Sequence, residues 1–149
     1  MSEAIVLSEH VCELGEGPTY DSDTATLFWF DINGRKLLSR RDADGVTQVV
    51  DLPEMASALA VIDERRHLIL TETGIHVRDL ATGRLSLHTA VEADNPLTRS
   101  NDARVHASGA LWFGTMAKTE ATGAGAIYWF RKGELRRLYG SISIPNSIC

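Results

Sequence analysis

The sequence lacks several features, and each shortage excludes a class of protein. None of its apolar runs approaches the roughly 20 residues that a transmembrane helix needs. The first ten residues have neither a basic start nor a long apolar core, so they do not have the pattern of a signal peptide. Two cysteines, Cys12 and Cys149, are too few for a disulfide framework, and they favour a reducing cytoplasm. The net charge of -5 offers no basic surface, so we expect neither a nucleic-acid nor a membrane partner.

Helical periodicity is also scarce, and short alternating runs take its place. An apolar content of 44% over 149 residues indicates one folded domain rather than disorder. Gly, Asp, Asn and Pro separate the runs, as in proteins built from hairpins. The pairs Asn33-Gly34 and Asp44-Gly45 are expected to supply the positive φ angles of tight hairpins. The first series of predicted strands covers residues 26–31, 36–40 and 46–50.

The same series recurs twice along the chain. The second round covers residues 57–61, 67–71, 75–78 and 84–88, and the third covers 110–113, 126–130 and 134–138. Their central strands carry Leu27, Leu68 and Leu111, which lie 41 and 43 residues apart. Four short antiparallel strands per roughly 40–45 residues is the spacing of a propeller blade. The sequence therefore predicts an all-β fold, with about three blades of a single β-propeller domain over residues 1–149. A β-sandwich with similar hairpins is the alternative.

Three blades do not make a closed ring. Propellers close with about four to eight blades, so three would leave sheet faces and edges open to water. We expect either further blades or self-association, in which a second copy closes the ring through the open blade edges. Residues 141–149 have the pattern of the opening of another strand. Trp29, Trp112 and Trp129 lie on predicted strands and are expected to pack between blades.

Positions of equal phase in successive blades should converge at the central channel. Counting from Glu16 reaches Ala58, Asn101 and Asn146 at intervals of 42, 43 and 45 residues. A carboxylate and amide oxygens that meet in this way favour hard cations such as calcium and magnesium. None of the five histidines shows a metal-ligand spacing in the sequence.

Three motifs in order add a family resemblance. Leu14-Gly-Glu-Gly-Pro18, followed by Leu27-Phe-Trp-Phe-Asp-Ile32, resembles the opening of the regucalcin/gluconolactonase family. Arg99-Ser-Asn-Asp102 with Leu111-Trp-Phe-Gly-Thr-Met116 is similar to the family's next signature, and Ile144-Pro-Asn-Ser147 to its third. The resemblance implies that this chain is the N-terminal half of a six-bladed β-propeller that uses a divalent metal to open sugar lactones.

The resemblance also implies roles for individual residues. Glu16 and Asn146 would bind one divalent metal ion (Ca²⁺, Zn²⁺, Mn²⁺ or Mg²⁺). Arg99 and Asn101 would hold the hydroxyls and ring oxygens of the sugar lactone, and Glu120 is a weaker candidate because it is shifted by about one residue from the family's acidic contact. No organic cofactor is implied.

Each role has a plainer alternative. Glu16 could satisfy the amide groups of a turn, Asn146 could be a turn residue after Pro145, and Arg99 could form a surface salt bridge. Asp102 is expected to orient its loop by hydrogen bonds.

The family's third metal ligand has no match in this sequence. It is an aspartate that also serves as the base, and the resemblance places it beyond Cys149. We therefore expect a lactonase that converts a sugar lactone to the aldonic acid, with the 149 residues alone inactive. The alternatives are a non-catalytic calcium-binding or sugar-binding propeller, or an inactive fragment.

Overall fold

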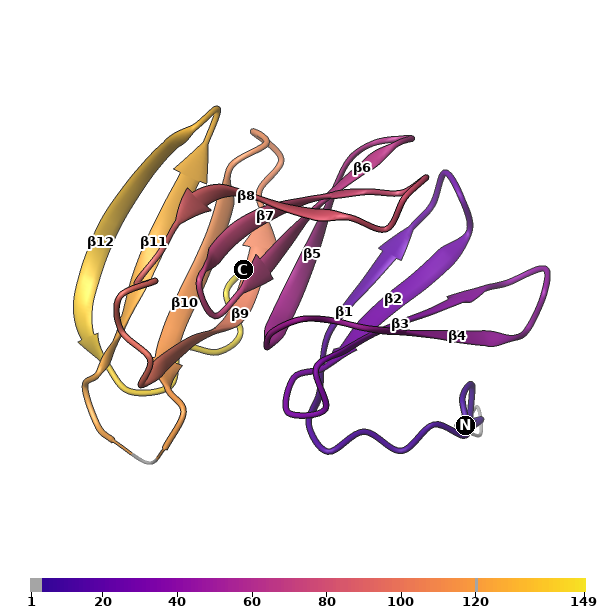
Figure 1. Cartoon of the computed structure of the whole chain (residues 1–149), viewed down its shortest axis with the longest axis horizontal. Helices are drawn as coiled ribbons and strands as arrows, with labels where there is room; N and C mark the ends of the chain where they lie inside the picture. Colours follow the sequence, from indigo (N-terminus) through magenta and orange to yellow (C-terminus); the bar gives the residue numbers. More distant parts are fainter. Residues whose placement is uncertain (1–3, 120) are drawn as a thin grey trace.

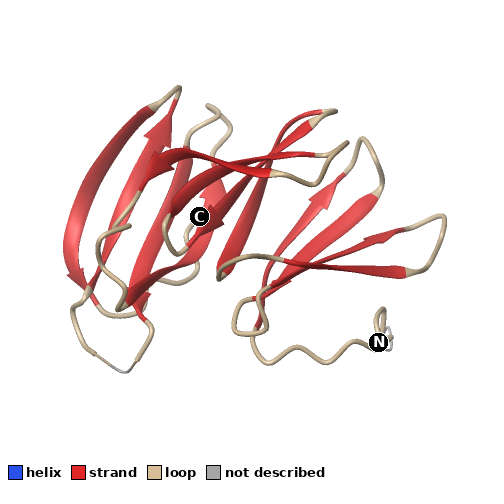
Figure 2. Ribbon diagram, in the orientation of Figure 1, coloured by secondary structure: helices blue, strands red, loops and turns tan. Residues whose placement is uncertain are grey.

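The computed structural model describes residues 4–119 and 121–149, and this part of the chain contains strands and turns but no helix (Figure 2). Its strands form three four-stranded antiparallel sheets, each made of strands consecutive in the sequence (Figure 1). The first sheet contains β1 (Gly15–Asp21), β2 (Thr26–Asp31), β3 (Lys36–Arg41) and β4 (Thr47–Asp51). The second contains β5 (Ala56–Asp63), β6 (Arg66–Thr71), β7 (Gly74–Asp79) and β8 (Leu85–Ala90). The third contains β9 (Thr98–Val105), β10 (Leu111–Ala117), β11 (Gly125–Arg131) and β12 (Glu134–Ile142).

The predicted repeat is confirmed. Leu27, Leu68 and Leu111 lie on β2, β6 and β10, the second strand of each sheet. The first strands, β1, β5 and β9, contact one another and form the inner edge of the three sheets. The sequence delimited neither β1 nor β9 as a strand, although counting by blade period placed Glu16 and Asn101 on inner strands. The described residues therefore contain no helix that could span a membrane.

Two apolar clusters join the sheets. The cluster between the first and second sheets contains Phe28, Phe30, Ile32, Leu37, Leu52, Ala56, Leu59 and Ile69. The cluster between the second and third contains Ala58, Leu70, Ile75, Val91, Leu111, Phe113, Ala126, Tyr128 and Phe130. Neighbouring residues of one strand serve different clusters, because successive side chains point to opposite faces of a sheet. The second sheet therefore packs against a neighbouring sheet on each face, mainly through β5 and β6, while β8 is largely exposed.

The three tryptophans do not pack between these blades. Trp112 and Trp129 alternate with residues of the second cluster, so they lie on the face of the third sheet that points away from the second. They line a depression of about 480 Å³ together with Ile148 and Cys149. Trp29 alternates with Phe28 and Phe30 in the same way on the first sheet. The prediction assigned the tryptophans to strands without assigning them to a face, and among the three described sheets they lie on the two outer faces.

The hairpin turns follow the prediction at one pair and not at the other. Gly45 has a φ of 63°, as the Asp-Gly pair requires. At Asn33-Gly34, however, the positive φ of 52° belongs to Arg35. Gly34 is needed for a different reason, since a Cβ there would lie 2.3 Å from Oδ2 of Asp31. Gly34 therefore leaves room for the buried carboxylate of Asp31, and Arg35 is the residue that adopts the left-handed conformation.

His67 on β6 is a buried histidine. Its side chain is 2% exposed and meets the ring of Phe28 edge-on, with 5.1 Å between centroids. Its Nδ1 has no hydrogen-bond partner among the described residues. Burial lowers the pKa of His67, and the charge of Arg78 lowers it further, while Asp21 and Asp63 oppose the shift. The folded protein therefore disfavours the protonated imidazole.

We expect the free energy of unfolding to decrease as the pH falls below about 6.5, because the unfolded chain then binds the histidine proton more tightly than the folded chain. His67→Phe should flatten this dependence between roughly pH 6.5 and 5.5, above the range in which most carboxylates titrate. Urea unfolding at a series of pH values measures the slope. His106→Gln, at an exposed histidine, is the matched control and should keep the original slope. A slope that His67→Phe leaves unchanged would contradict the prediction.

Candidate functional site

The inner strands are tied to one another by side chains. Ser57 Oγ on β5 donates to Ser100 Oγ on β9 at 2.8 Å, and both residues are buried. Thr19 Oγ1 on β1 lies 3.4 Å from the carbonyl oxygen of Leu59 on β5. These contacts bring the three strands together along the inner edge seen in Figure 1. They place the predicted positions Glu16, Ala58 and Asn101 on adjacent strands.

Gly17 permits the close approach of β1 to β5. A Cβ at Gly17 would lie 2.1 Å from the carbonyl oxygen of Ser57, and the residue has a φ of 62°. The pairing of β1 with β2 also shifts register between Glu16 and Thr19. A bulge of this kind redirects a side chain where a strand is otherwise regular. Gly17 therefore fixes the position of Glu16 at the inner edge.

Arg99 is a buried cation on β9. Its side chain forms no ion pair with the described carboxylates, and its Nη1 donates to the carbonyl oxygen of Ser100 at 2.8 Å and to Oδ1 of Asn101 at 2.9 Å. Burial lowers the pKa of the Arg99 guanidinium, and the negative charge of Glu16 opposes this shift. The surface salt bridge considered as an alternative is therefore wrong. Arg99 supports the side chain of Asn101 and lies within the field of Glu16.

Asn101 extends this contact to the C-terminal segment. Its Nδ2 donates to the carbonyl oxygen of Pro145 at 2.9 Å and lies 3.4 Å from Oδ1 of Asn146. Asp102 holds the same segment, since its Oδ2 accepts from the backbone N–H of Ile148 at 2.8 Å. This agrees with the orienting role expected for Asp102. The structure thus brings together three predicted positions, Arg99, Asn101 and Asn146.

The C-terminal segment itself does not form the strand predicted for residues 141–149. β12 continues to Ile142, and the following residues have no regular secondary structure. They are held instead by side-chain hydrogen bonds and by packing. Pro145 packs so closely on Gly114 that a Cβ at Gly114 would lie 2.2 Å from the proline ring. A strand needs a neighbour with which to pair its backbone, and here the hydrogen bonds of this segment come from Asn101 and Asp102.

A depression of about 250 Å³ opens beside these residues. It is lined by residues of β1, β5 and β9 and of the C-terminal segment, among them Glu16, Ala58, Asp102 and Ser147. Glu16 and Asn146 are both exposed. A carboxylate and an amide oxygen suit a hard divalent cation, so the donor types fit the metal that the resemblance implies. Glu120 lies outside the described residues.

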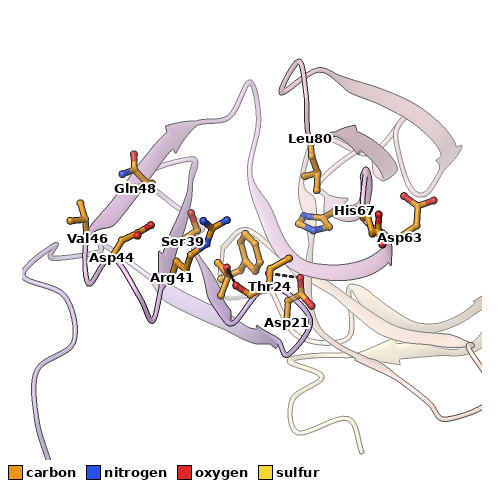
Figure 3. Close-up of a pocket in the computed structure, with 13 residues that line it drawn as sticks. Asp21, Thr24, Ser39, Arg41, Asp44, Val46, Gln48, Asp63, His67 and Leu80 are labelled. Carbon is orange, nitrogen blue, oxygen red and sulfur yellow. Dashed lines mark hydrogen bonds between the residues drawn. The ribbon is translucent and has the colours of Figure 1, made fainter.

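A second depression, of about 340 Å³, lies between the first and second sheets (Figure 3). Asp21 and His67 contribute to its lining. Oδ2 of Asp21 accepts from Thr24 Oγ1 at 2.6 Å, and its Oδ1 accepts from the backbone N–H of Asp23 at 3.1 Å. This carboxylate therefore stabilises the turn after β1. Because β1 ends at Asp21 and Glu16 is near its start, the groove lies at the other end of the inner strand from the candidate site.

Three four-stranded blades with converging inner strands define this chain as part of a β-propeller that carries a polar site at its inner edge. The family profile described as "SMP-30/Gluconolactonase/LRE-like region" matches residues 14–149, so the chain belongs to this family.

Individual relatives agree with this assignment. The chain is 46% identical to a candidate sugar lactone lactonase of Rhizobium meliloti (strain 1021), with 96% of this chain and 48% of that protein covered. It is 34% identical to the L-arabinolactonase of Azospirillum brasilense, over 75% of this chain and 37% of that protein. The chain spans half or less of the length of these curated relatives.

A solved structure confirms the fold. The calcium-binding protein regucalcin of Agrobacterium tumefaciens strain C58 superposes with a TM-score of 0.94 at 50% identity, over 97% of this chain and 49% of that one. The three sheets of this chain thus match half of a six-bladed propeller.

Gly17→Ala should destabilise the fold more than Gly83→Ala. Both glycines have positive φ angles, of 62° and 72°, so alanine is strained at either position. Only at Gly17 does the added Cβ meet another strand, because nothing lies within 4 Å of the Cβ built at Gly83. We expect Gly17→Ala to lower the free energy of unfolding by about 1–3 kcal/mol more than Gly83→Ala. Urea unfolding measures both variants, and equal losses would show that β1 and β5 do not need this close approach.

Proposed function

We propose that this chain supplies one half of the site of a sugar lactone lactonase, which hydrolyses the lactone to the aldonic acid. The observation that carries the proposal is the hydrogen-bonded connection from Arg99 through Asn101 to Asn146, with the charge of Glu16 nearby. Family membership and the name of the relative that is 46% identical support the substrate class.

Glu16 and Asn146 would hold one divalent cation, Ca²⁺, Zn²⁺, Mn²⁺ or Mg²⁺, at the mouth of the inner strands. Both offer exposed oxygen atoms, and the contact of Asn146 Oδ1 with Asn101 Nδ2 leaves a second lone pair on that oxygen. When bound, such a cation supplies Lewis-acid polarisation of a carbonyl group. We expect the Glu16 and Asn146 oxygens to lie close enough to share one ion.

Arg99 and Asn101 would bind and orient the sugar lactone. One nitrogen of Arg99 is used within the protein, which leaves further N–H donors of its rigid fork for hydroxyl and ring oxygens. Because Asn101 is fixed by bonds to Arg99 and Pro145, its position does not depend on the substrate. Orientation that is set in advance raises the rate of attack by water. Glu120 remains a weaker candidate for a substrate contact.

A base for the attacking water is not matched within these 149 residues. The proposal therefore assigns the proton acceptor, an aspartate, and the third metal ligand to sequence outside this chain. It follows that metal and lactone can bind here more readily than the lactone can be hydrolysed.

A calcium-binding propeller without turnover is the second candidate. The observation that favours it is the 50% identity with a structure described as a calcium-binding protein. The two candidates differ in hydrolysis and not in metal binding, so a binding measurement and an activity measurement are both needed.

Glu16→Gln should weaken the binding of Ca²⁺ or Mn²⁺ by at least roughly tenfold, because it removes the charged ligand while keeping the shape of the side chain. Isothermal titration calorimetry measures the affinity. Glu64→Gln, which removes an exposed carboxylate from the turn between β5 and β6, is the control and should bind like the original chain. Equal affinities for the original chain and Glu16→Gln would remove Glu16 from the site.

The 149-residue chain should show little or no lactone hydrolysis with added calcium, zinc or manganese. The assay uses gluconolactone and is corrected for spontaneous ring opening. Metal-dependent turnover that disappears in Glu16→Gln would show that the chain contains its own base, which would overturn the assignment of the aspartate to sequence outside it.

A further inference from the structure

Three side chains with different donor atoms meet where the N-terminal segment passes the end of β2. The ligand atoms of His10, Cys12 and Asp31 all lie within 4.8 Å of one another. His10 and Cys12 are half-buried, and Asp31 is 3% exposed. Imidazole nitrogen, thiolate sulfur and carboxylate oxygen are the donor types with which proteins bind Zn²⁺. The sequence did not indicate this group, because Asp31 lies far from the other two residues along the chain.

The carboxylate of Asp31 is fixed before any cation arrives. Its Oδ1 accepts from the backbone N–H groups of Leu14 at 3.0 Å and Gly34 at 3.1 Å, and its Oδ2 accepts from that of Glu13 at 3.1 Å. An ionised carboxylate has about four lone-pair sites, so one site on Oδ2 remains for a ligand. These bonds also hold the residues directly after Cys12, which keeps the thiol beside the carboxylate.

We propose that His10, Cys12 and Asp31 form a binding site for a thiophilic divalent cation, with Zn²⁺ as its best match. A thiolate and a carboxylate together neutralise the two charges of the ion, and a neutral imidazole completes three protein ligands. Thiolate and imidazole ligands select zinc over calcium and magnesium, which prefer oxygen. A fourth, open position would hold water or a small exogenous ligand. Bond lengths of about 2.0–2.3 Å put tetrahedral ligands roughly 3–4 Å apart, so small side-chain rotations close the site.

The site has no ligand in common with the proposed lactonase site. It uses none of the residues Glu16, Arg99, Asn101 and Asn146, and its donors favour a different class of cation. Burial and the negative charge of Asp31 raise the pKa of the Cys12 thiol, so cation binding there would release a proton. Its expected role is to attach the N-terminal segment to the first sheet.

Cobalt is the probe, because a tetrahedral Co²⁺ thiolate gives sulfur-to-metal charge-transfer absorption in the near ultraviolet and intense visible bands. Titration of the 149-residue chain with Co²⁺ should develop both features to one equivalent, and Zn²⁺ should displace them. Cys12→Ser should abolish the charge-transfer band. His10→Gln should weaken Co²⁺ binding by at least tenfold, since losing even an outer-shell partner of a metal ligand costs roughly 10–100-fold.

Two matched variants test whether the cobalt spectrum arises at Cys12. Cys149→Ser removes the other cysteine, which is exposed, and should keep the full spectrum. Glu16→Gln should also keep it, so that failure of the lactonase proposal leaves this result unaffected. Alkylation followed by mass spectrometry gives a second readout, in which Zn²⁺ should protect Cys12 and leave Cys149 reactive. The proposal is overturned if the charge-transfer band is absent, if it survives Cys12→Ser, or if Zn²⁺ protects neither cysteine.

Discussion

The packing of one sheet against the next is the constraint on which the rest of this structure depends. The second sheet is apolar on both faces, so it cannot be stable in water without the first and the third. Burial of Phe30 and Phe113, which are both fully buried, contributes about 1.5–3 kcal/mol each by apolar transfer. Each sheet is a unit of four strands connected by hairpins. The packing between these sheets therefore sets their relative positions more than any single strand pairing does.

The same packing brings polar groups to the inner edge. Once the sheets are stacked, β1, β5 and β9 lie side by side, and residues about 42 positions apart become neighbours. Arg99 is then enclosed without an ion pair among the described residues and is compensated by oxygens of its own strand and by the field of Glu16. A buried guanidinium of this kind is costly unless its donors are used. The unused donors of Arg99 are the physical reason to expect a ligand rich in oxygen beside it.

Much of this arrangement could be predicted because a blade is a local unit. The positions of Leu27, Leu68 and Leu111 depend only on the period of the hairpins, and equal phase then locates Glu16 and Asn101. Two of the features that the sequence did not predict depend on contacts between segments distant in sequence, whereas Gly34 contacts a carboxylate only three residues away. The tryptophan faces follow from which side the neighbouring sheet occupies. The role of Gly34 follows from a carboxylate buried beneath it, and the path of residues 143–149 follows from Asn101 and Asp102.

Asp31 connects the metal site inferred at the N-terminal segment with the placement of Glu16. Its carboxylate binds the amides of Glu13 and Leu14, and the carbonyl of Leu14 accepts from the backbone N–H of Ile32 at 2.9 Å. These bonds set the register in which Gly15 pairs with Asp31, and Glu16 is the next residue along β1. A cation on Oδ2 of Asp31 would therefore act on the group that positions Glu16 at the inner edge. The two sites differ in donor chemistry, but the Asp31 carboxylate is a ligand of one and helps to position Glu16 in the other.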